Sequence, residues 1–228
     1  MNKNDIAGLI LAGGKSVRMQ KIFQDKSHTD LEAIRNSKCH LHKFFLPLAN
    51  KSLLEHCINR LKEHVSNVSI STNDISLVKE TLPKEITNII SFCEDDEFLE
   101  CGPLAGIYSA LKMYDNQKQA YSHIVSLPAD SPFLSNNVLC KMLTTTKTHP
   151  KCIISCSTQD NIHYACSIWP THLKSKMEVY LNSGKRSIKS FIQENDTKII
   201  HFRNNDNSFF NINTPEDYIY AKKLFEKT

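Results

Sequence analysis

Ile6-Ala-Gly-Leu-Ile-Leu-Ala-Gly-Gly14, near the start of the chain, gives the clearest indication of its fold. Its first six residues, Ile6–Leu11, form a continuous apolar run, which is typical of a strand that is buried on both faces. Strands of this kind belong to parallel sheets. The adjacent glycines Gly13 and Gly14 end the run, because they let the backbone turn sharply. The stretch therefore predicts a parallel-sheet strand that is followed at once by a tight turn.

Strands and helices are predicted to alternate along the rest of the chain. Apolar runs indicate further strands at 68–71, 86–92, 122–127, 152–156, 163–169 and 198–202. Helices are expected after the capping box 52–55, over 74–82, 104–113 and 135–145, from Pro170 onward, and after the cap 214–217. This alternation predicts an α/β fold, a three-layer α/β/α sandwich with a mostly parallel sheet. Such sheets bind ligands beyond the carboxyl ends of their strands, so the site is expected there.

Length and composition fit one globular domain. The chain has 228 residues, of which 40% are apolar and 23% are charged, which is enough to bury a sizeable core. We therefore expect a single domain over residues 1–228. No apolar run approaches the ~20 residues of a membrane helix, and the first residues lack the features of a signal peptide. The expected location is the cytoplasm, without a membrane partner.

Charge and cysteine content argue against two further classes of protein. The net charge of +4 is too small and too evenly spread to indicate nucleic-acid binding. The eight cysteines include no Cys-x-x-Cys pair, and we interpret them as small buried apolar residues rather than as disulfides or metal ligands. Residues 20–41 break the alternation, because they are polar, mixed in charge and without a clear period. We interpret them as a long inserted loop.

The first motif with chemical meaning is Leu11-Ala-Gly-Gly-Lys-Ser-Val-Arg-Met19, directly after the first strand. The glycines can present backbone N–H groups to an anion, and Lys15 and Arg18 add positive charge. The motif predicts a phosphate-binding loop, with a plain tight turn as the alternative. It is not a Walker A loop, because that motif needs a glycine at position 9, where this chain has leucine.

The second motif is Ser126-Leu-Pro-Ala-Asp-Ser-Pro-Phe133, which also follows a predicted strand. Asp130 lies between two prolines that restrict the loop. A carboxylate fixed at a strand end is a suitable ligand for Mg²⁺, which prefers oxygen ligands and bridges to phosphates. The alternative is an aspartate that only caps the helix after it.

Two further motifs leave structural and functional interpretations open. Gly102-Pro-Leu-Ala-Gly106 either allows a ligand to approach a helix start or allows the helix to pack closely on the sheet. Asn211 and Asn213 alternate along the chain, so an extended backbone turns both amides to one side. There they either bind a polar ligand or hydrogen-bond the loop itself. His163 is interpreted as a structural histidine, with contact to a ligand as the alternative.

Five motifs, taken in order, resemble those of the molybdenum cofactor guanylyltransferase family. Besides the glycine motif they are Leu46-Pro-Leu-x-x-Lys-x-Leu-Leu-Glu-His56, Gly102-Pro-Leu-Ala-Gly-Ile107, Pro128-Ala-Asp-Ser-Pro-Phe133 and Asn211-Ile-Asn-Thr-Pro-Glu-Asp217. The resemblance implies a nucleotidyltransferase fold of Rossmann type. It also implies transfer of GMP from GTP to molybdopterin, or its molybdenum form, with release of pyrophosphate. Leu-Ala-Gly-Gly favours GTP over CTP, because the cytidylyl relatives usually have Leu-Ala-Ala-Gly.

The resemblance also assigns roles to individual residues. Nucleotide contacts are expected at Leu11, Ala12, Gly13, Gly14, Lys43, Ser71, Asp95 and Asp130, with Asn73 and Asp96 as the alternatives to Ser71 and Asp95. Asp130 is the expected Mg²⁺ ligand, and Arg18 and Lys43 are expected to offset charge on the departing pyrophosphate. Asn211 and Asn213, together with the loop 184–186, are expected to face the pterin.

This sequence departs from the family pattern around the glycine motif. The usual Met-Gly is Met19-Gln20, and the usual Asp-Lys pair is His42-Lys43, displaced by the insertion. Asp25-Lys26 also matches the pair, but only Lys43 is followed by matching residues. Two alternatives to guanylyl transfer therefore stay open. One is a related nucleotidyltransferase that uses CTP or another phosphate acceptor, and the other is a non-catalytic homologue that delivers cofactor to a molybdoenzyme or another assembly protein.

Overall fold

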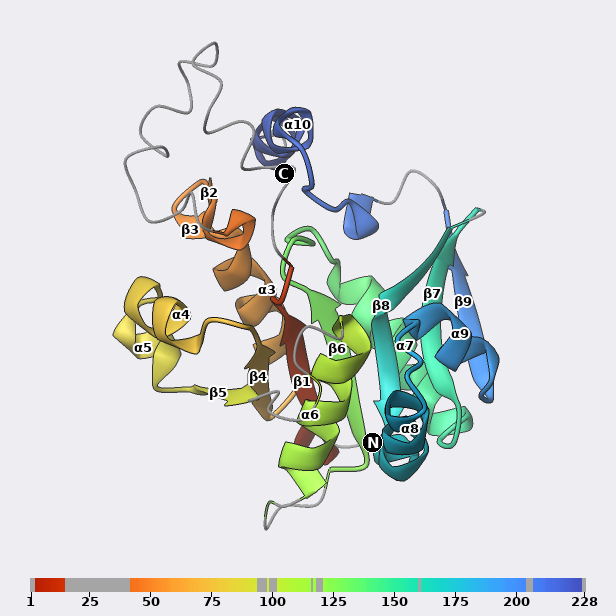
Figure 1. Cartoon of the computed structure of the whole chain (residues 1–228). Helices are drawn as coiled ribbons and strands as arrows, with labels where there is room; N and C mark the ends of the chain where they lie inside the picture. Colours follow the sequence, from red (N-terminus) through yellow and green to blue (C-terminus); the bar gives the residue numbers. More distant parts are fainter. Residues whose placement is uncertain are drawn as a thin grey trace.

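A seven-stranded sheet lies at the centre of the computed structural model, with helices on both of its faces (Figure 1). The structure describes residues 3–14, 42–93, 98, 102–115, 117, 121–159, 161–203 and 207–226. The strands of the sheet, in spatial order, are β5 (Ile90–Cys93), β4 (Asn67–Ser71), β1 (Ile6–Leu11), β6 (His123–Pro128), β8 (Asn161–Pro170), β7 (Ile153–Thr158) and β9 (Thr197–Phe202).

The sheet is mostly parallel, as predicted. β1 pairs in parallel with β4 on one side and with β6 on the other, and β7 pairs in parallel with β9. Only β8 is antiparallel to its neighbours in the sheet, β6 and β7. Ile6 and Ile10 of β1 belong to the apolar cluster on one face, whereas Ala7 and Leu9 belong to the cluster on the other. The first strand is therefore buried on both faces, which explains its unbroken apolar run.

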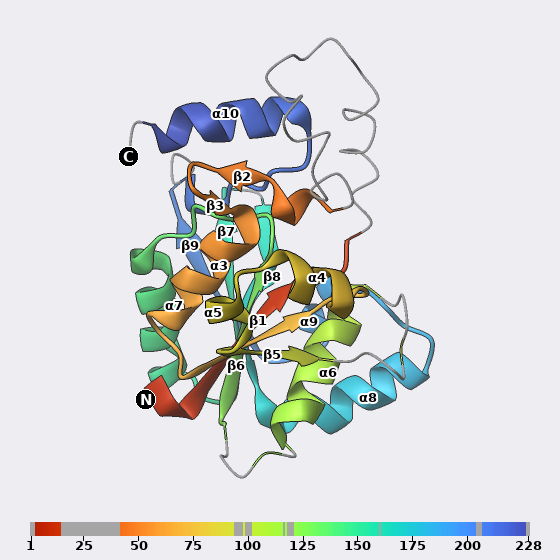
Figure 2. The same ribbon diagram turned by 90° about the vertical axis from the view of Figure 1, so that its left-hand side faces the viewer.

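The helices form the two outer layers of the sandwich. α3 (Leu53–Lys62), α4 (Ile75–Thr81) and α7 (Asn136–Thr148) bury their apolar residues in one cluster. α6 (Pro103–Asp115), α8 (Lys174–Asn182) and α9 (Ile188–Gln193) bury theirs in the other. Figure 2 shows α3 and α7 on one side of the sheet and α6 and α8 on the opposite side. The predicted three-layer α/β/α architecture is confirmed.

A third apolar cluster joins the last helix to a small hairpin. The hairpin consists of β2 (Pro47–Leu48) and β3 (Lys51–Ser52), and α10 (Pro215–Phe225) packs against it. Tyr218 of α10 donates a hydrogen bond to the carbonyl of Pro47. The capping boxes predicted at 52–55 and 214–217 are both present at the starts of α3 and α10. This cluster fixes the segment that follows Lys43 and the segments on either side of Asn213 beyond the carboxyl ends of the strands (Figure 1).

Three local predictions need correction. Residues 86–92 divide between α5 (Lys84–Thr87) and β5, because Pro83 starts a short helix and the apolar run is too short for its period to distinguish helix from strand. Pro170 ends β8 and precedes a 3₁₀ turn, so α8 begins only at Lys174. α9 was not expected. Residues 20–41 lie outside the described residues, so the inserted loop and the single-domain assignment stay predictions.

The thiols follow the prediction only in part. Cys57, Cys93, Cys156 and Cys166 are buried, but Cys152 is half-buried and Cys140 is exposed on α7. Cys39 and Cys101 lie outside the described residues. Within the ranges that the structure describes, no helix is both long enough and apolar enough to cross a bilayer.

A substitution at Gly106 tests how closely α6 packs on the sheet. A Cβ at this position would overlap the hydroxyl of Ser71 and lie 3.0 Å from the Ser71 Cβ. We expect Gly106→Ala to lower the free energy of unfolding by about 1 kcal/mol, since overpacking outweighs the helix propensity of alanine. Chemical denaturation measures the change. Adding Ser71→Gly should restore part of it, and a more stable Gly106→Ala protein would contradict the packing explanation.

His123 makes stability depend on pH. Its side chain is buried at the start of β6, where Nε2 donates to the carbonyl of Pro150 at 2.9 Å, and burial lowers the pKa of the ring from 6.5. The unfolded chain therefore binds the proton at a higher pH than the folded chain. The contribution of His123 to the free energy of unfolding is complete above pH 6.5 and is lost as the pH falls below that value. We expect urea denaturation to show a lower free energy of unfolding at pH 5 than at pH 8. In His123→Gln this decrease should be smaller. Equal losses in both proteins would reject the assignment.

Candidate active site

The glycine turn and the Asp130 loop leave the sheet side by side. Leu11 at the end of β1 is level with Ser71 of β4 and with Pro128 of β6. Backbone hydrogen bonds continue past the strand ends, from the Ala12 N–H to the Ser71 carbonyl at 2.8 Å and from the Ala129 N–H to the Leu11 carbonyl at 3.1 Å. The predicted phosphate loop and the predicted metal ligand therefore meet at one edge of the sheet.

Lys43, Asp130 and Asn213 form the polar centre at this edge. The Lys43 ammonium donates to Asp130 Oδ2 at 2.5 Å and to Asn213 Oδ1 at 2.6 Å. The side chains of Lys43 and Asp130 are only 15% and 14% exposed, so their ion pair is well shielded from water. Phe44 and Phe45, both buried, anchor the 3₁₀ turn that carries the lysine. The structure thus brings together residues from three distant parts of the chain.

One of the two carboxylate oxygens of Asp130 is available to bind another group. Oδ2 accepts from Lys43, but Oδ1 is buried and has no hydrogen-bond partner among the residues that the structure describes. No described residues form a group of three or more His, Cys, Asp or Glu side chains that could enclose a metal. Mg²⁺, however, commonly binds through one or two carboxylates together with substrate phosphates and water. The chemistry and burial of Asp130 fit such a site.

The two asparagines of the last motif contact different neighbours. Asn213 accepts from Lys43, and its own N–H donates to Asp217 Oδ2 at 2.9 Å in the cap of α10. Asn211 Oδ1 instead accepts from the Ser131 hydroxyl at 2.5 Å and lines an adjoining cavity of about 290 Å³. Sequence alternation predicted two amides turned to one side, but the structure gives them different partners, Asn213 at the charged centre and Asn211 at the cavity beside it.

The predicted nucleotide side of the site is described only in part. Asn73 Nδ2 donates to the Gly13 carbonyl at 3.3 Å, whereas the Ser71 hydroxyl lies against Gly106. The geometry thus holds Asn73 closer to the glycine turn than the Ser71 side chain. Arg18 and Lys15, like Asp95 and Asp96, lie outside the described residues. Contacts of Leu11, Ala12, Gly13, Gly14 and Ser71 with a nucleotide stay predictions.

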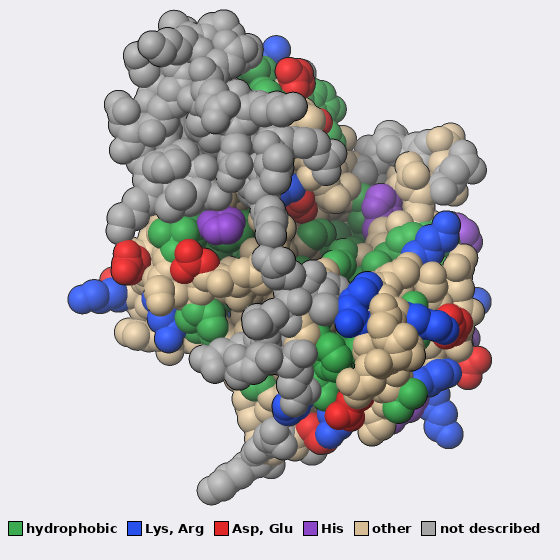
Figure 3. Space-filling model, in the orientation of Figure 1, with side chains coloured by type: hydrophobic (Ala, Val, Ile, Leu, Met, Phe, Trp, Pro, Cys, Tyr) green, Lys and Arg blue, Asp and Glu red, His purple; other side chains and the backbone are tan. Residues whose placement is uncertain are grey.

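The surface around the centre is hollowed. Figure 3 shows hydrophobic side chains in the hollow between the part of the molecule that carries α10 and the sheet below it. A largely apolar cavity adjoins the polar centre through Ser131 and Asn211, which line it. The site therefore combines a small charged centre with an apolar recess, which is the usual composition of a small-molecule site.

Comparison with known proteins agrees with this geometry. The model of the MobA-like NTP transferase domain matches residues 8–199, which is most of the chain. The chain belongs to the MobA-like NTP transferase family. The resemblance seen in the five motifs is thereby confirmed, and so is membership of a family of nucleotidyltransferase enzymes.

Individual relatives extend over nearly the whole chain. A protein of Rhizobium johnstonii, named Molybdenum cofactor guanylyltransferase, is 25% identical over 99% of this chain and 96% of its own length. A protein of the same name from Haemophilus influenzae is 29% identical over 93% of this chain and 95% of its own. The crystal structure of Molybdopterin-guanine dinucleotide biosynthesis protein A from Archaeoglobus fulgidus has a TM-score of 0.68, with 16% identity, and covers 97% of this chain and 100% of that one. The structural likeness confirms the nucleotidyltransferase fold.

His42 directly precedes Lys43, and sequence analysis gave it no role beyond its departure from the Asp-Lys pair. Its ring stacks on Phe44, with centroids 4.9 Å apart, and its Nδ1 is buried without a hydrogen-bond partner among the described residues. Burial lowers the pKa of the ring, while the nearby charge of Asp74 and the Gly14 backbone act in the opposite direction. The His42 ring thus lies near the glycine turn, directly before the lysine of the polar centre.

Cys57 lies behind the loop that carries Asp130. Its thiol donates to the carbonyls of Pro128 and Ala129, each at 3.7 Å, and burial together with the charge of Asp130 raises its pKa. A thiol held in this protonated form is not a nucleophile. Cys57 therefore supports the Asp130 loop by packing and weak hydrogen bonds.

The loop 184–186 of the MobA-like chain has partners of its own. Arg186 Nη1 donates to the carbonyls of Leu181 and Lys185, at 2.5 and 2.8 Å, and the Lys185 ammonium lies 3.0 Å from a Glu194 carboxylate oxygen. The bond to Leu181 satisfies a carbonyl in the last turn of α8. Contact of this loop with a pterin stays a prediction.

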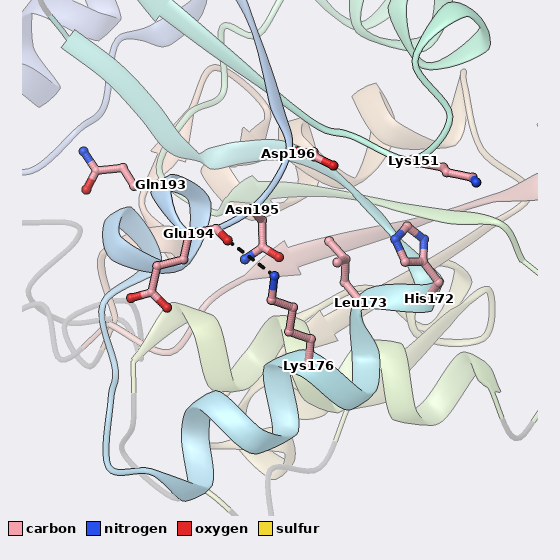
Figure 4. Close-up of a pocket in the computed structure, with 8 residues that line it drawn as sticks. All are labelled: Lys151, His172, Leu173, Lys176, Gln193, Glu194, Asn195 and Asp196. Carbon is pink, nitrogen blue, oxygen red and sulfur yellow. Dashed lines mark hydrogen bonds between the residues drawn. The ribbon is translucent and has the colours of Figure 1, made fainter.

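A second cavity, of about 470 Å³, lies at the other end of the sheet (Figure 4). Its lining residue His172 follows β8, whose last residue Pro170 pairs with the first residue of β6, His123. The ammonium of Lys176, another lining residue, donates a hydrogen bond to the Glu194 carbonyl at 3.3 Å. Cationic and acidic side chains are mixed around it, and it is remote from the carboxyl ends of β1 and β6. It does not belong to the active site.

Proposed function

We propose that this chain transfers GMP from GTP to molybdopterin, or its molybdenum form, and releases pyrophosphate. The single observation that carries the proposal is the convergence of Lys43, Asp130 and Asn213 beside the glycine turn at the carboxyl ends of β1 and β6. The relatives named Molybdenum cofactor guanylyltransferase support the choice of donor and acceptor.

The reaction needs charge stabilisation more than covalent catalysis. A terminal phosphate oxygen of the acceptor attacks the α-phosphorus of GTP, and the bond from that phosphorus to the β-phosphate oxygen breaks. Lys43 is placed to offset charge on the phosphates, because its ammonium is fixed by two acceptors and shielded from water. Arg18 and the glycine N–H groups are proposed to assist at the departing pyrophosphate.

Asp130 is proposed to hold Mg²⁺ through Oδ1, the oxygen with no partner among the described residues. Bound there, the ion would neutralise and align the triphosphate oxygens. Lys43 and Asn213 would orient the carboxylate, since Lys43 bonds both side chains.

The strand order supports separate positions for donor and acceptor. The glycine turn and Asn73 lie toward β4, whereas Ser131, Asn211 and the apolar cavity lie toward β8. We therefore propose that GTP occupies the β1–β4 side and the pterin the β6–β8 side, with their reacting phosphates meeting at Asp130. This arrangement gives each substrate its own approach to one polar centre.

One experiment tests the reaction. The protein is incubated with molybdopterin, Mg²⁺ and either GTP or CTP, and the product is identified by mass. We expect the guanine dinucleotide and pyrophosphate with GTP only. Product with CTP would favour a cytidylyltransferase, and GTP binding without pyrophosphate release would favour a non-catalytic protein that delivers cofactor.

A further inference from the structure

The apolar cavity beside the polar centre has a chemically distinct lining. None of the lining residues has a permanently charged side chain, and most are apolar, among them Leu127, Leu134, Ile162, Ile188 and Phe209. Burial also lowers the pKa of His163, which keeps its imidazole neutral at pH 7. A phosphate would find no cation among these lining residues. The cavity instead suits an uncharged group of low polarity.

Two of its lining residues form a flat, firmly held pair. The rings of His163 and Phe209 stack in parallel, with centroids 4.2 Å apart and planes at 9°. Thr158 fixes the histidine through a 2.8 Å hydrogen bond to Nε2, and Phe202 packs against Phe209 from outside the cavity lining, at 5.4 Å between centroids. The pair is therefore held by its own neighbours before any ligand arrives. Such preorganisation reduces the entropy lost on binding.

The cavity adjoins the reacting centre through the chain itself. Pro128 and Ser131, which line it, flank Asp130 in one loop, and Asn211 lies two residues before Asn213. The Ile212 N–H donates to the Asp130 carbonyl at 3.0 Å, so the two lining segments are joined at the metal-ligand residue. A molecule with a flat ring at one end and a phosphate at the other can thus place its ring in the cavity and its phosphate at Asp130.

We propose that His163 and Phe209 determine acceptor specificity, by forming the wall against which the flat heteroaromatic ring of the acceptor binds. The inference rests on the proposed function, because that function supplies a pterin as the ring. A neutral imidazole and a phenyl ring offer polarisable surface to such a ring, and base–aromatic contacts of this kind contribute substantially to binding. It gives His163 a ligand contact besides its structural bond to Thr158.

The test measures ring binding without turnover. Unsubstituted pterin is titrated with the full-length protein, and quenching of pterin fluorescence reports binding. We expect saturable quenching by the unaltered protein and about tenfold weaker binding by Phe209→Leu, since an aromatic contact is lost. His163→Gln, which can still bond Thr158 but lacks the ring, should also bind pterin more weakly.

Tyr121→Leu provides the control. It removes an aromatic ring just before β6, at the opposite end of that strand from Asp130 and outside the cavity lining, so we expect normal pterin binding and normal turnover. Thermal denaturation shows whether each variant folds. In steady-state assays, Phe209→Leu should raise KM for molybdopterin and leave KM for GTP unchanged. Equal losses in Phe209→Leu and Tyr121→Leu, or no saturable quenching by the unaltered protein, would overturn the proposal.

Failure of this inference and failure of the proposed function look different. If pterin binds in a Phe209-dependent way but no guanine dinucleotide forms, the ring site stands and guanylyl transfer is wrong. If the dinucleotide forms and Phe209→Leu changes neither pterin binding nor KM for molybdopterin, guanylyl transfer stands and the ring wall is wrong.

Discussion

Asp130→Ala is expected to reduce pyrophosphate release by at least about a hundredfold while the chain still folds, an effect comparable to removing a single electrostatic stabiliser from other enzymes. Asp130 contributes the only carboxylate of the described polar centre, and its Oδ1 is buried without a partner among the described residues. The fold should survive, because the Asp130 carbonyl still accepts from Ile212 and Lys43 still has Asn213. Turnover, circular dichroism and thermal denaturation provide the measurements.

Two comparisons separate the charge of Asp130 from its shape and from ion pairing in general. Asp130→Asn keeps the size of the side chain and an acceptor for Lys43, so a loss of similar size would assign the effect to the negative charge. Asp115→Ala breaks the exposed pair with Lys174 and should leave turnover unchanged. Near-normal turnover of Asp130→Ala with Mg²⁺ would reject the metal role.

Lys43→Ala is expected to lose far more activity than Lys26→Ala, again by about a hundredfold. Lys43 lies at the polar centre and contacts Asp130 and Asn213, whereas Lys26, which lies outside the described residues, is not followed by matching residues of the motif. Steady-state rates with GTP and molybdopterin measure both variants. The opposite order would mean that Asp25-Lys26 is the true equivalent of the Asp-Lys pair.

Loss of Lys43 should also affect stability, which must be separated from chemistry. Its removal leaves the largely buried Asp130 carboxylate without its cation, so we expect the free energy of unfolding to fall by about 1–3 kcal/mol. Rates are therefore compared well below the unfolding temperature of both proteins. Lys174→Ala removes a lysine from an exposed ion pair and serves as the matched control for both measurements.

Features of the fold that depend on local sequence patterns could be predicted from the sequence. The unbroken apolar run Ile6–Leu11 predicted a strand buried on both faces, and the capping boxes at Ser52 and Thr214 predicted the starts of α3 and α10. Motif spacing then selected Lys43 and Asp130, which the structure joins. The strand and the caps are confirmed because each depends on neighbouring residues. The structure brings Lys43 and Asp130 together, while their roles stay predictions.

Contacts between distant residues could not be predicted in the same way. Lys43 and Asn213 are 170 positions apart, and no local pattern indicates that they share a hydrogen bond. His163 and Phe209 are stacked only because β8 and the segment before α10 meet at the site. The division of 86–92 between α5 and β5 was missed for the reverse reason, since so few residues carry too weak a periodic signal.

The contact between His42 and Gly14 has a consequence for how this enzyme tolerates changes in length. Residues 15–41 are flanked by Gly14 and His42, and the Gly14 backbone lies close enough to the His42 ring to act on its pKa. An insertion between these two residues therefore has its two ends close together, and Phe44 and Phe45 hold the lysine turn in the core independently of it. For a flexible loop whose ends are held together, doubling the number of residues raises the free energy of loop closure by only about 0.6 kcal/mol. Evolution can therefore lengthen or shorten the connection at this junction while the ammonium of Lys43 keeps its position over Asp130.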